Sequence, residues 1–342
     1  MTEEERTVNA ETAEVTSEAQ VEVPVEAAPV APKKKGMSSG LKRLITGVLL
    51  AGVMLVFLLV LRPICIHSFD VLAMFFVVAG GLEMRKALKT GGYNVMLAPQ
   101  IVFFVMVYPL FLLLGTDGIL IALAVSATVA LAIFTFKHTY SLTDLGMSIF
   151  EIVYPSVFVA MIMAVNWYAG DLLALFILIA VPLASDAFAY FVGSKLGKHK
   201  LCPEISPKKS VEGLYGGIFG AILMGCIIML LFDVFHLFDG VNNIKLPALS
   251  DHIGVSIALY SVLSVLVMLS GMVGDLVASW IKRKVGIKDY GKVFPGHGGV
   301  MDRMDSVIFS MPVVYVFFTI YNLVQNGGVV ERISIITEIL GA

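Results

Sequence analysis

Long uninterrupted apolar runs constrain the fold of this chain more than any other feature of its sequence. From Leu44 onward they follow one another at residues 44–61, 64–82, 96–115, 118–136, 147–167, 171–192, 214–236, 253–278 and 306–324. Each run has about 20 residues, and a helix of that length crosses the ~30 Å hydrocarbon core of a bilayer. The sequence therefore predicts an all-α, polytopic transmembrane protein with about nine membrane-spanning helices.

The composition agrees with a membrane protein and argues against a water-soluble one. Of the 342 residues, 58% are hydrophobic and 15% are charged, whereas about 25% are charged in an ordinary soluble domain. Residues 1–40 differ from the rest, because they are rich in Glu, Ala, Val, Thr and Pro and contain no aromatic residue. Such a segment buries too little apolar area to offset its ordering entropy. We therefore expect a disordered acidic N-terminal tail at 1–40 and a transmembrane domain at 41–342.

Lysine and arginine are distributed unevenly between the two sides of the predicted membrane. With the N-terminus in the cytosol, 21 of the 24 Lys and Arg residues fall on cytosolic segments. This asymmetry is the one that the positive-inside rule describes for a multi-pass protein of the cell membrane. Two long, basic, glycine-rich segments then lie on the cytosolic face, at 193–213 and 279–305, and the active site is expected there.

The segment 279–305 has the residue types that a phosphate-binding site needs. Five cations precede a Pro-Gly-His-Gly-Gly turn at 295–299. Backbone amides at glycines can approach phosphate oxygens closely, and the cations supply opposite charge. Asp302 and Asp305 follow three residues apart, on one face of a helix, and Mg²⁺ favours one or two carboxylates with waters and substrate phosphates. For the cations alone, the simpler interpretation is a loop that obeys the positive-inside rule.

The complete order of residues in this segment is more specific than its charge. The residues that carry it are Ser279, Lys282-Arg283, Lys288-Asp289, Pro295-x-His297-Gly298-Gly299 and Asp302-Arg303-x-Asp305. This order resembles, without a mismatch, the signature of the phosphatidate cytidylyltransferase family, also called the CDP-diacylglycerol synthases. A CDP-alcohol phosphotransferase is a closer chemical rival than most, but the Asp-Gly-x-x-Ala-Arg core of those enzymes is absent.

The segment around 185–213 adds to the resemblance. Asp186, Tyr190 and Gly193 match an Asp-x-x-Ala-Tyr-x-x-Gly element of the family, and a Ser-Pro-Lys-Lys-Ser-Val-Glu-Gly run follows at 206–213. Ser210 stands where threonine is usual and keeps the hydroxyl group. Val211 stands where an aromatic residue is common, so no stacking role is carried over to it.

The resemblance implies a reaction in which the cytidylyl group of CTP is transferred to phosphatidic acid, forming CDP-diacylglycerol and pyrophosphate. It implies Mg²⁺ as the cofactor and CTP, phosphatidic acid and the bilayer as partners, with no nucleic acid; a homodimer stays open. The implied catalytic residues are Lys282, Arg283, Lys288, Asp289, His297 and Arg303. The implied substrate-binding residues are Ser206, Lys208, Lys209, Ser210, Glu212, Ser279, Gly298 and Gly299. The implied metal ligands are Asp275, Asp302, Asp305 and Asp186.

Three of these residues keep an alternative role. An unpaired carboxylate within a membrane costs on the order of 2.5–3.5 kcal/mol or more, so Asp275 is expected to be either paired or metal-bound. Asp186 is either a site residue or a structural hydrogen-bonding group between spans. The phosphate monoester of phosphatidic acid is largely dianionic at neutral pH, so no general base is needed. His297 is therefore expected either to hydrogen-bond a phosphate or to pack the turn.

Two other functions are compatible with a multi-pass chain. A CTP-dependent polyprenol kinase shares the membrane setting and the nucleotide, but it would release CDP rather than pyrophosphate. A membrane transporter would explain many spans and a few buried acids, but the sequence shows no interrupted pair of helices or internal repeat.

Overall fold

The computed structural model describes residues 39–325 of the chain, except for 168–170, 239–251 and 295–297. The predicted N-terminal tail lies outside these residues apart from Ser39 and Gly40, and so does His297. The predictions made for them stay predictions.

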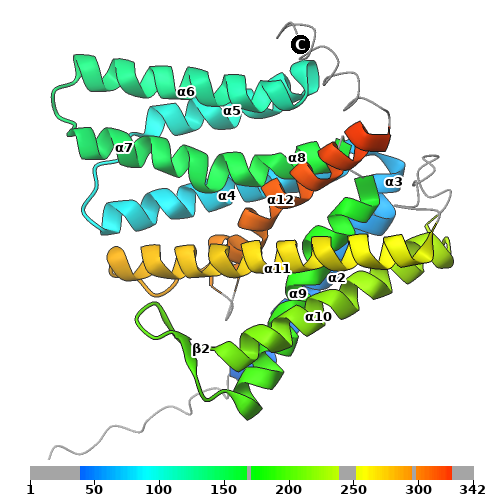
Figure 1. Cartoon of the computed structure of the whole chain (residues 1–342). Coiled ribbons are helices and arrows are strands. Elements are labelled where there is room, and N and C mark those ends of the chain that lie inside the picture. The colour runs from blue at the N-terminus through cyan, green and yellow to red at the C-terminus, as the bar shows by residue number, and fades with distance from the viewer. Residues whose placement is uncertain (1–38, 168–170, 239–251, 295–297, 326–342) are drawn as a thin grey trace, which may run out of the picture. The chain divides into compact units, whose positions relative to one another are not determined.

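The described part of the chain is helical almost throughout, as the apolar runs predict (Figure 1). The first half contains α2 (Ser39–Val56), η1 (Phe57–Leu61), α3 (Arg62–Ile64), α4 (His67–Thr90), α5 (Leu97–Leu114), α6 (Thr116–Phe136), α7 (Leu142–Glu151), η2 (Ile152–Val157) and α8 (Phe158–Trp167). The second half contains α9 (Asp171–Leu196), β1 (Lys200–Cys202), β2 (Ser206–Ser210), α10 (Val211–Met229), η3 (Leu230–Val234), α11 (Ile253–Lys284) and α12 (Met301–Gln325).

Eight helical segments of the described residues are long and apolar enough to cross a membrane. They are Gly47–Ile64, Leu97–Leu114, Thr116–Phe136, Leu142–Trp167, Leu172–Leu196, Val211–Val234, Ile253–Lys284 and Met301–Val324. Each coincides with one of the predicted apolar runs. The remaining run, at 64–82, lies in α4, which has transmembrane length but is not among the eight. Asp70 lies near the start of α4, and Glu83 and three cations lie near its end, so its apolar centre is shorter than the helix. The protein is a multi-pass membrane protein.

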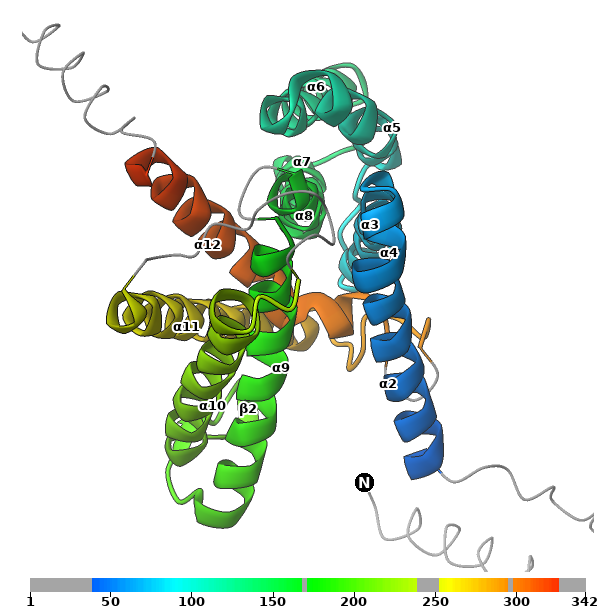
Figure 2. The same cartoon turned by 90° about the vertical axis from the view of Figure 1, so that its right-hand side faces the viewer.

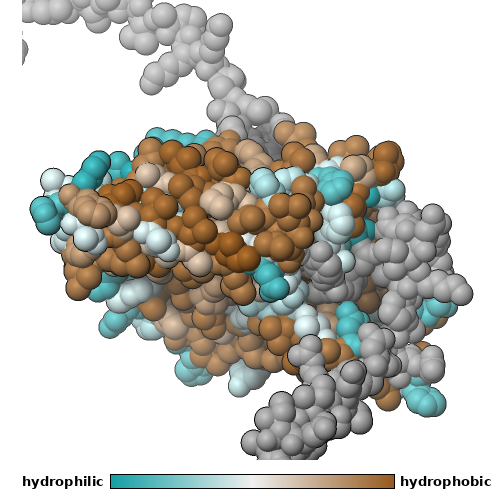
Figure 3. All heavy atoms as spheres, turned by 90° about the horizontal axis from the view of Figure 1, so that it is seen from above, coloured by the Kyte–Doolittle hydropathy of each residue, from teal (hydrophilic) through white to brown (hydrophobic). Residues whose placement is uncertain are grey.

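The segments differ in how much protein surrounds them. Of the Leu142–Trp167 segment, 72% is buried inside the protein, whereas only 22% of the Thr116–Phe136 segment is buried. Helices α5 and α6 pack mainly against each other, along the upper edge of Figures 1 and 2. Figure 3 views this side from above, and hydrophobic residues dominate its surface. An apolar outer surface of this kind is what contact with lipid requires.

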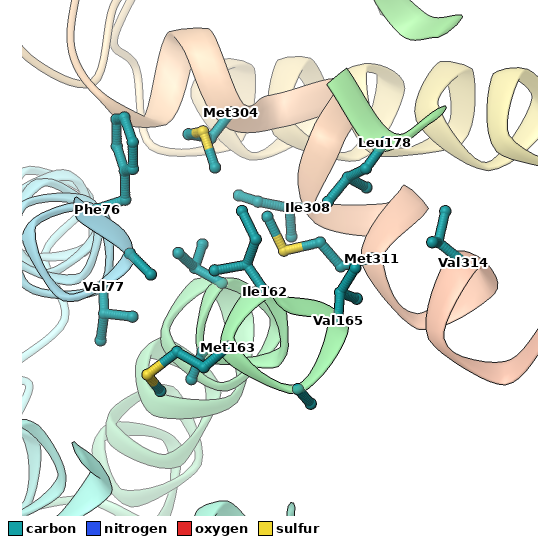
Figure 4. Close-up of a cluster of buried hydrophobic side chains, with 14 of the residues drawn as sticks. Phe76, Val77, Ile162, Met163, Val165, Leu178, Met304, Ile308, Met311 and Val314 are labelled. Carbon is teal, nitrogen blue, oxygen red and sulfur yellow. The ribbon is translucent and has the colours of Figure 1, made fainter. Parts of the chain in front are cut away.

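The core lies where α4, α8, α9 and α12 meet. Phe76 and Val77 of α4 face Ile162 of α8 and Met304 and Ile308 of α12 (Figure 4). All five side chains are buried. This packing fixes the position of α12, whose first two turns carry three of the predicted site residues.

Both boundaries of the predicted basic segment 279–305 are wrong, because the helices on its two sides are longer than the apolar runs. Helix α11 does not end near residue 278 but continues to Lys284, which makes it 32 residues long, or about 48 Å. Its last turn therefore extends beyond a ~30 Å hydrocarbon core, and its three terminal cations are favourable at a helix C-terminus. Helix α12 begins at Met301 rather than near 306. The connection between the two helices therefore spans 285–300, shorter than the predicted loop.

The other basic segment contains a β-hairpin that the sequence did not predict. Strands β1 and β2 are antiparallel, with Lys200 opposite Ser210 and Cys202 opposite Ser206. Neither strand shows the alternation of apolar and polar residues that marks a half-buried strand. The hairpin is a small addition to a fold that is otherwise all-α.

Candidate active site

Close packing of α10 on α9 positions the hairpin. Four glycines of α10 lie against α9, and a Cβ on Gly216 or Gly220 would collide with the side chain of Val192 or Phe188. The hairpin leads directly into α10, since Ser210 is both the last residue of β2 and the N-cap of the helix. The Ser210 hydroxyl accepts a hydrogen bond of 3.1 Å from the Gly213 backbone N–H. A serine is a favoured residue at this position. The predicted substrate-binding hydroxyl thus has a structural role as well.

A cavity of about 640 Å³ lies between the hairpin and helices α9, α10, α11 and α12. Its polar lining consists of Ser185, Asp186, Tyr190, Ser194, Lys200, Lys208, Lys209, Ser210, Asp275, Asp302, Arg303, Asp305 and Ser306. Its apolar lining includes Pro182, Leu201, Leu214, Met268 and Met272. The cavity therefore offers both charged and apolar surface, as a site for an amphiphilic phosphate ester needs.

All four predicted metal ligands line this cavity. Asp186 comes from α9, Asp275 from α11, and Asp302 and Asp305 from the first turns of α12. Asp275 interacts electrostatically with both Asp186 and Asp305. Within the described residues, no group of three or more His, Cys, Asp or Glu side chains has the arrangement of a complete metal site. The carboxylates share a cavity without forming a closed cage.

Cations face these carboxylates from the hairpin and from α12. Lys200, Lys208, Lys209 and Arg303 line the cavity. The Lys209 ammonium lies 2.5 Å from the Asp275 carboxylate, and both side chains are about one-quarter exposed. Lys200 was not among the predicted residues, although the basic run at 198–200 was visible in the sequence. The cavity therefore holds positively charged groups next to its carboxylates.

Asp302 has a second role, because it organises the connection between α11 and α12. Its carboxylate accepts hydrogen bonds from Lys282 Nζ at 2.9 Å, from the Tyr290 N–H at 2.9 Å and from the Gly299 N–H at 3.0 Å. Only 8% of Asp302 is exposed. The Tyr290 hydroxyl donates to the Ala278 carbonyl at 2.9 Å, and burial raises the pKa of this phenol, which keeps the donor protonated. These contacts tie the connection to both helices.

Among the described residues, the remaining predicted ones do not line the cavity. Ser279 donates to Asp275 at 3.4 Å, and Lys282 pairs with Asp302, so both act on cavity residues. The Glu212 carboxylate lies 2.7 Å from the His199 ring and also accepts a hydrogen bond from the His199 backbone N–H. These two contacts join the residues that flank the hairpin. The structure leaves five others outside the lining: Ser206, Arg283, Lys288, Asp289 and Gly298. Of these, Arg283, Lys288 and Asp289 are exposed.

Gly299 belongs to the same connection and lies against Glu83, a residue that the sequence did not predict. Glu83 of α4 accepts a hydrogen bond of 2.9 Å from the Met301 N–H, across 218 positions of the chain. The only signal in the sequence is an acid just after an apolar run. Nothing in the sequence shows that this acid meets the start of α12.

Comparison with known proteins agrees with the motifs and the geometry. Residues 41–321 match the model of the cytidylyltransferase family. The chain is 31% identical over 289 residues to a phosphatidate cytidylyltransferase of Bacillus subtilis, which covers 82% of this chain and 98% of the relative. It is 36% identical over 183 residues to a phosphatidate cytidylyltransferase of Aquifex aeolicus, covering 53% and 60% of the two chains. A family match of this extent, together with the cavity that its motif residues line, establishes that the chain belongs to the cytidylyltransferase family.

Proposed function

We propose that this protein transfers the cytidylyl group of CTP to phosphatidic acid and so forms CDP-diacylglycerol and pyrophosphate. The observation that carries the proposal is the cavity in which Asp186, Asp275, Asp302 and Asp305 face a set of Lys and Arg side chains beside apolar surface. Two anionic substrates must meet for this reaction, so their repulsion has to be suppressed by positive charge. The names and extent of the matching relatives support the same activity.

In the proposed reaction, a phosphate oxygen of phosphatidic acid attacks the α-phosphorus of CTP. The bond between the α-phosphorus and the oxygen leading to the β-phosphate breaks, and pyrophosphate leaves. The attacking phosphate is largely dianionic above its second pKa of about 6, so no side chain needs to remove a proton. Lys208, Lys209 and Arg303 line the cavity, and in this proposal they bind phosphate oxygens and orient the two substrates.

We propose Mg²⁺ as the cofactor, because the donor set fits this ion. Mg²⁺ in proteins is held by one or two carboxylates together with waters and substrate phosphates, so a cavity without a complete cage suits it. Asp275 and Asp305 are the carboxylates we assign to it, since Asp302 already accepts three hydrogen bonds. A bound Mg²⁺ supplies charge neutralisation on the transferred phosphoryl group. In this assignment Asp275 and Asp305 hold the metal, and the nearby cations hold the phosphates.

We infer that the cavity opens toward the cytosol and that the N-terminus lies on the same side. The support is the distribution of Lys and Arg in the sequence. The cavity is lined by Lys208 and Lys209 from one of the two basic segments and by Arg303 from the other. Cysteines introduced at Lys288 and at Lys245 test the orientation in sealed vesicles, where only the second should react with an impermeant reagent added outside.

One assay tests the proposed activity. Purified protein in detergent is given labelled CTP, phosphatidic acid and Mg²⁺, and both products are measured. We expect a lipid-soluble nucleotide and an equal amount of pyrophosphate. Release of CDP with a phosphorylated lipid would identify a lipid kinase instead, and no product from either route would refute the proposal.

A further inference from the structure

Helix α12 begins beside the cavity without a capping side chain of its own. The residue before Met301 is Val300, which has no polar side chain. The first backbone N–H groups of a helix have no partner within the helix and need one from elsewhere. Here the partner comes from a distant helix, because Glu83 of α4 accepts from the Met301 N–H at 2.9 Å. The backbone of Val300 also interacts with the Glu83 carboxylate.

The connection before α12 fits closely around the same carboxylate. A Cβ at Gly291 or at Gly299 would collide with the Glu83 carboxylate oxygens. Neither of these glycines has a positive φ, unlike Gly286 and Gly298. The absence of a side chain at Gly291 and Gly299 is therefore explained by the space that Glu83 occupies, not by backbone conformation.

Two carboxylates thus accept hydrogen bonds from the same stretch of backbone. Asp302 accepts from the N–H groups of Tyr290 and Gly299, and Glu83 accepts from that of Met301. Each is 8% exposed, and Glu83 does not line the cavity. A negative charge at the N-terminal end of a helix is favourable, because the helix dipole is positive there.

We propose that Glu83 is a positioning residue of the active site. It holds the start of α12, and the described parts of the 285–300 connection, so that Asp302, Arg303 and Asp305 face the cavity. Glu83 does not touch substrate in this proposal and acts through the backbone of Met301. The inference rests on the proposed cytidylyltransferase activity for its kinetic test, but its structural test is independent of that activity.

The first experiment replaces the carboxylate in two ways. Glu83→Ala removes the acceptor, whereas Glu83→Gln keeps a carbonyl oxygen that can accept from Met301. We expect kcat to fall roughly tenfold or more for Glu83→Ala, the size of effect that supporting groups around a site commonly have. Glu83→Gln should retain most of the wild-type kcat. Equal and large losses for both variants, or no loss for Glu83→Ala, would overturn the proposal.

Hydrogen–deuterium exchange supplies a readout that does not depend on catalysis. Peptides that cover 298–305 should exchange faster in Glu83→Ala than in the wild type, and should be little changed in Glu83→Gln. The matched control is Glu151→Gln, since Glu151 is also a buried acid but pairs with Arg85 at 3.4 Å. Faster exchange of 298–305 in this control would show a general loss of packing and would overturn the specific role of Glu83.

A double-mutant cycle tests the contact directly and guards against variants that fail to fold. In the wild-type background, Gly291→Ala should lower kcat and speed exchange, because the added Cβ needs the space that the Glu83 carboxylate occupies. In the Glu83→Ala background that space is empty, so Gly291→Ala should add little further loss. Additive losses in kcat and exchange would show that the two residues act separately and would overturn the proposal. If the wild-type protein made no CDP-diacylglycerol, the proposed function would be refuted. The exchange rates of 298–305 would still test the role of Glu83.

Discussion

Acidic residues lie in two different settings, at the start of α4 and around the cavity, and their surroundings differ completely. Near the start of the helix, Asp70 is fully buried and accepts hydrogen bonds from Asn166 Nδ2 at 3.0 Å and from Trp167 Nε1 at 2.8 Å. Asn166 in turn accepts from Arg62 Nε at 2.6 Å. By contrast, the site acids Asp186 of α9, Asp275 of α11 and Asp305 of α12 border an open cavity of about 640 Å³.

This difference in surroundings distinguishes a structural acid inside a membrane protein from one that can bind a ligand. A buried polar network with good hydrogen bonds is stable and fixes how helices pack, but it offers nothing to a ligand. Carboxylates beside a cavity can exchange a lysine partner for a metal ion or admit a phosphate. An intramembrane acid is thus a functional candidate only when its surroundings leave it accessible. The predictions below test that distinction, from the largest expected effect to the smallest.

Replacing an acid at the cavity should have the largest effect on activity. Asp275→Asn keeps the size of the side chain and removes its charge, so insertion and folding should survive. If Asp275 holds Mg²⁺ against the nucleotide phosphates, kcat should fall by about 10²-fold or more, equivalent to at least ~2.7 kcal/mol of transition-state stabilisation. The measurement is Mg²⁺-dependent turnover of purified variants in detergent. Near-normal turnover with an unchanged Mg²⁺ profile would remove Asp275 from the metal site.

Replacing the acid of the closed network should have the opposite signature. Asp70→Asn loses charge-assisted hydrogen bonds to buried partners, which costs about 1.5–3 kcal/mol of stability each. We expect a lower midpoint of thermal unfolding in detergent and a kcat/KM within about twofold of the wild type at low temperature. A loss of activity as large as that of Asp275→Asn, at normal stability, would show that the closed network takes part in the reaction.

The lysine paired with a cavity acid should act mainly through binding. Lys209 lies 2.5 Å from Asp275 and lines the cavity, so Lys209→Met should weaken phosphate binding in the ground state and the transition state alike. Loss of such uniform binding raises KM more than it lowers kcat. We expect the KM for CTP to rise about tenfold, an effect consistent with one charge-assisted hydrogen bond. An unchanged KM would indicate that Lys209 only neutralises Asp275.

The two regions were also unequally predictable from the sequence. The spans and the four cavity acids were predicted because hydropathy and short motif spacing are local properties. The closed network joins Asp70 to Asn166 and Trp167 across almost 100 positions, and Glu83 meets Met301 across 218. No local pattern encodes such pairs. The hairpin was missed for a different reason, because its polar strands resemble a loop.

Arg283 should show the smallest effect, although the family resemblance implies a catalytic role for it. It lies in the last turn of α11, is exposed, and does not line the cavity. From this position it can raise the local concentration of anionic nucleotide through the electrostatic field, and salt screens this contribution over about 10 Å at 0.1 M ionic strength.

We therefore expect Arg283→Ala to raise the KM for CTP by about threefold at low salt, with kcat unchanged and with the difference vanishing at high salt. Lys282→Ala is the matched comparison, since Lys282 is the neighbouring cation and pairs with Asp302 at 2.9 Å. Its removal should lower kcat at every salt concentration, because it disturbs a cavity residue. A kcat loss for Arg283→Ala that persists at high salt would mean that the connection rearranges to bring Arg283 to the substrates. In that case, exposure in this structure would not distinguish catalytic residues from others at this site.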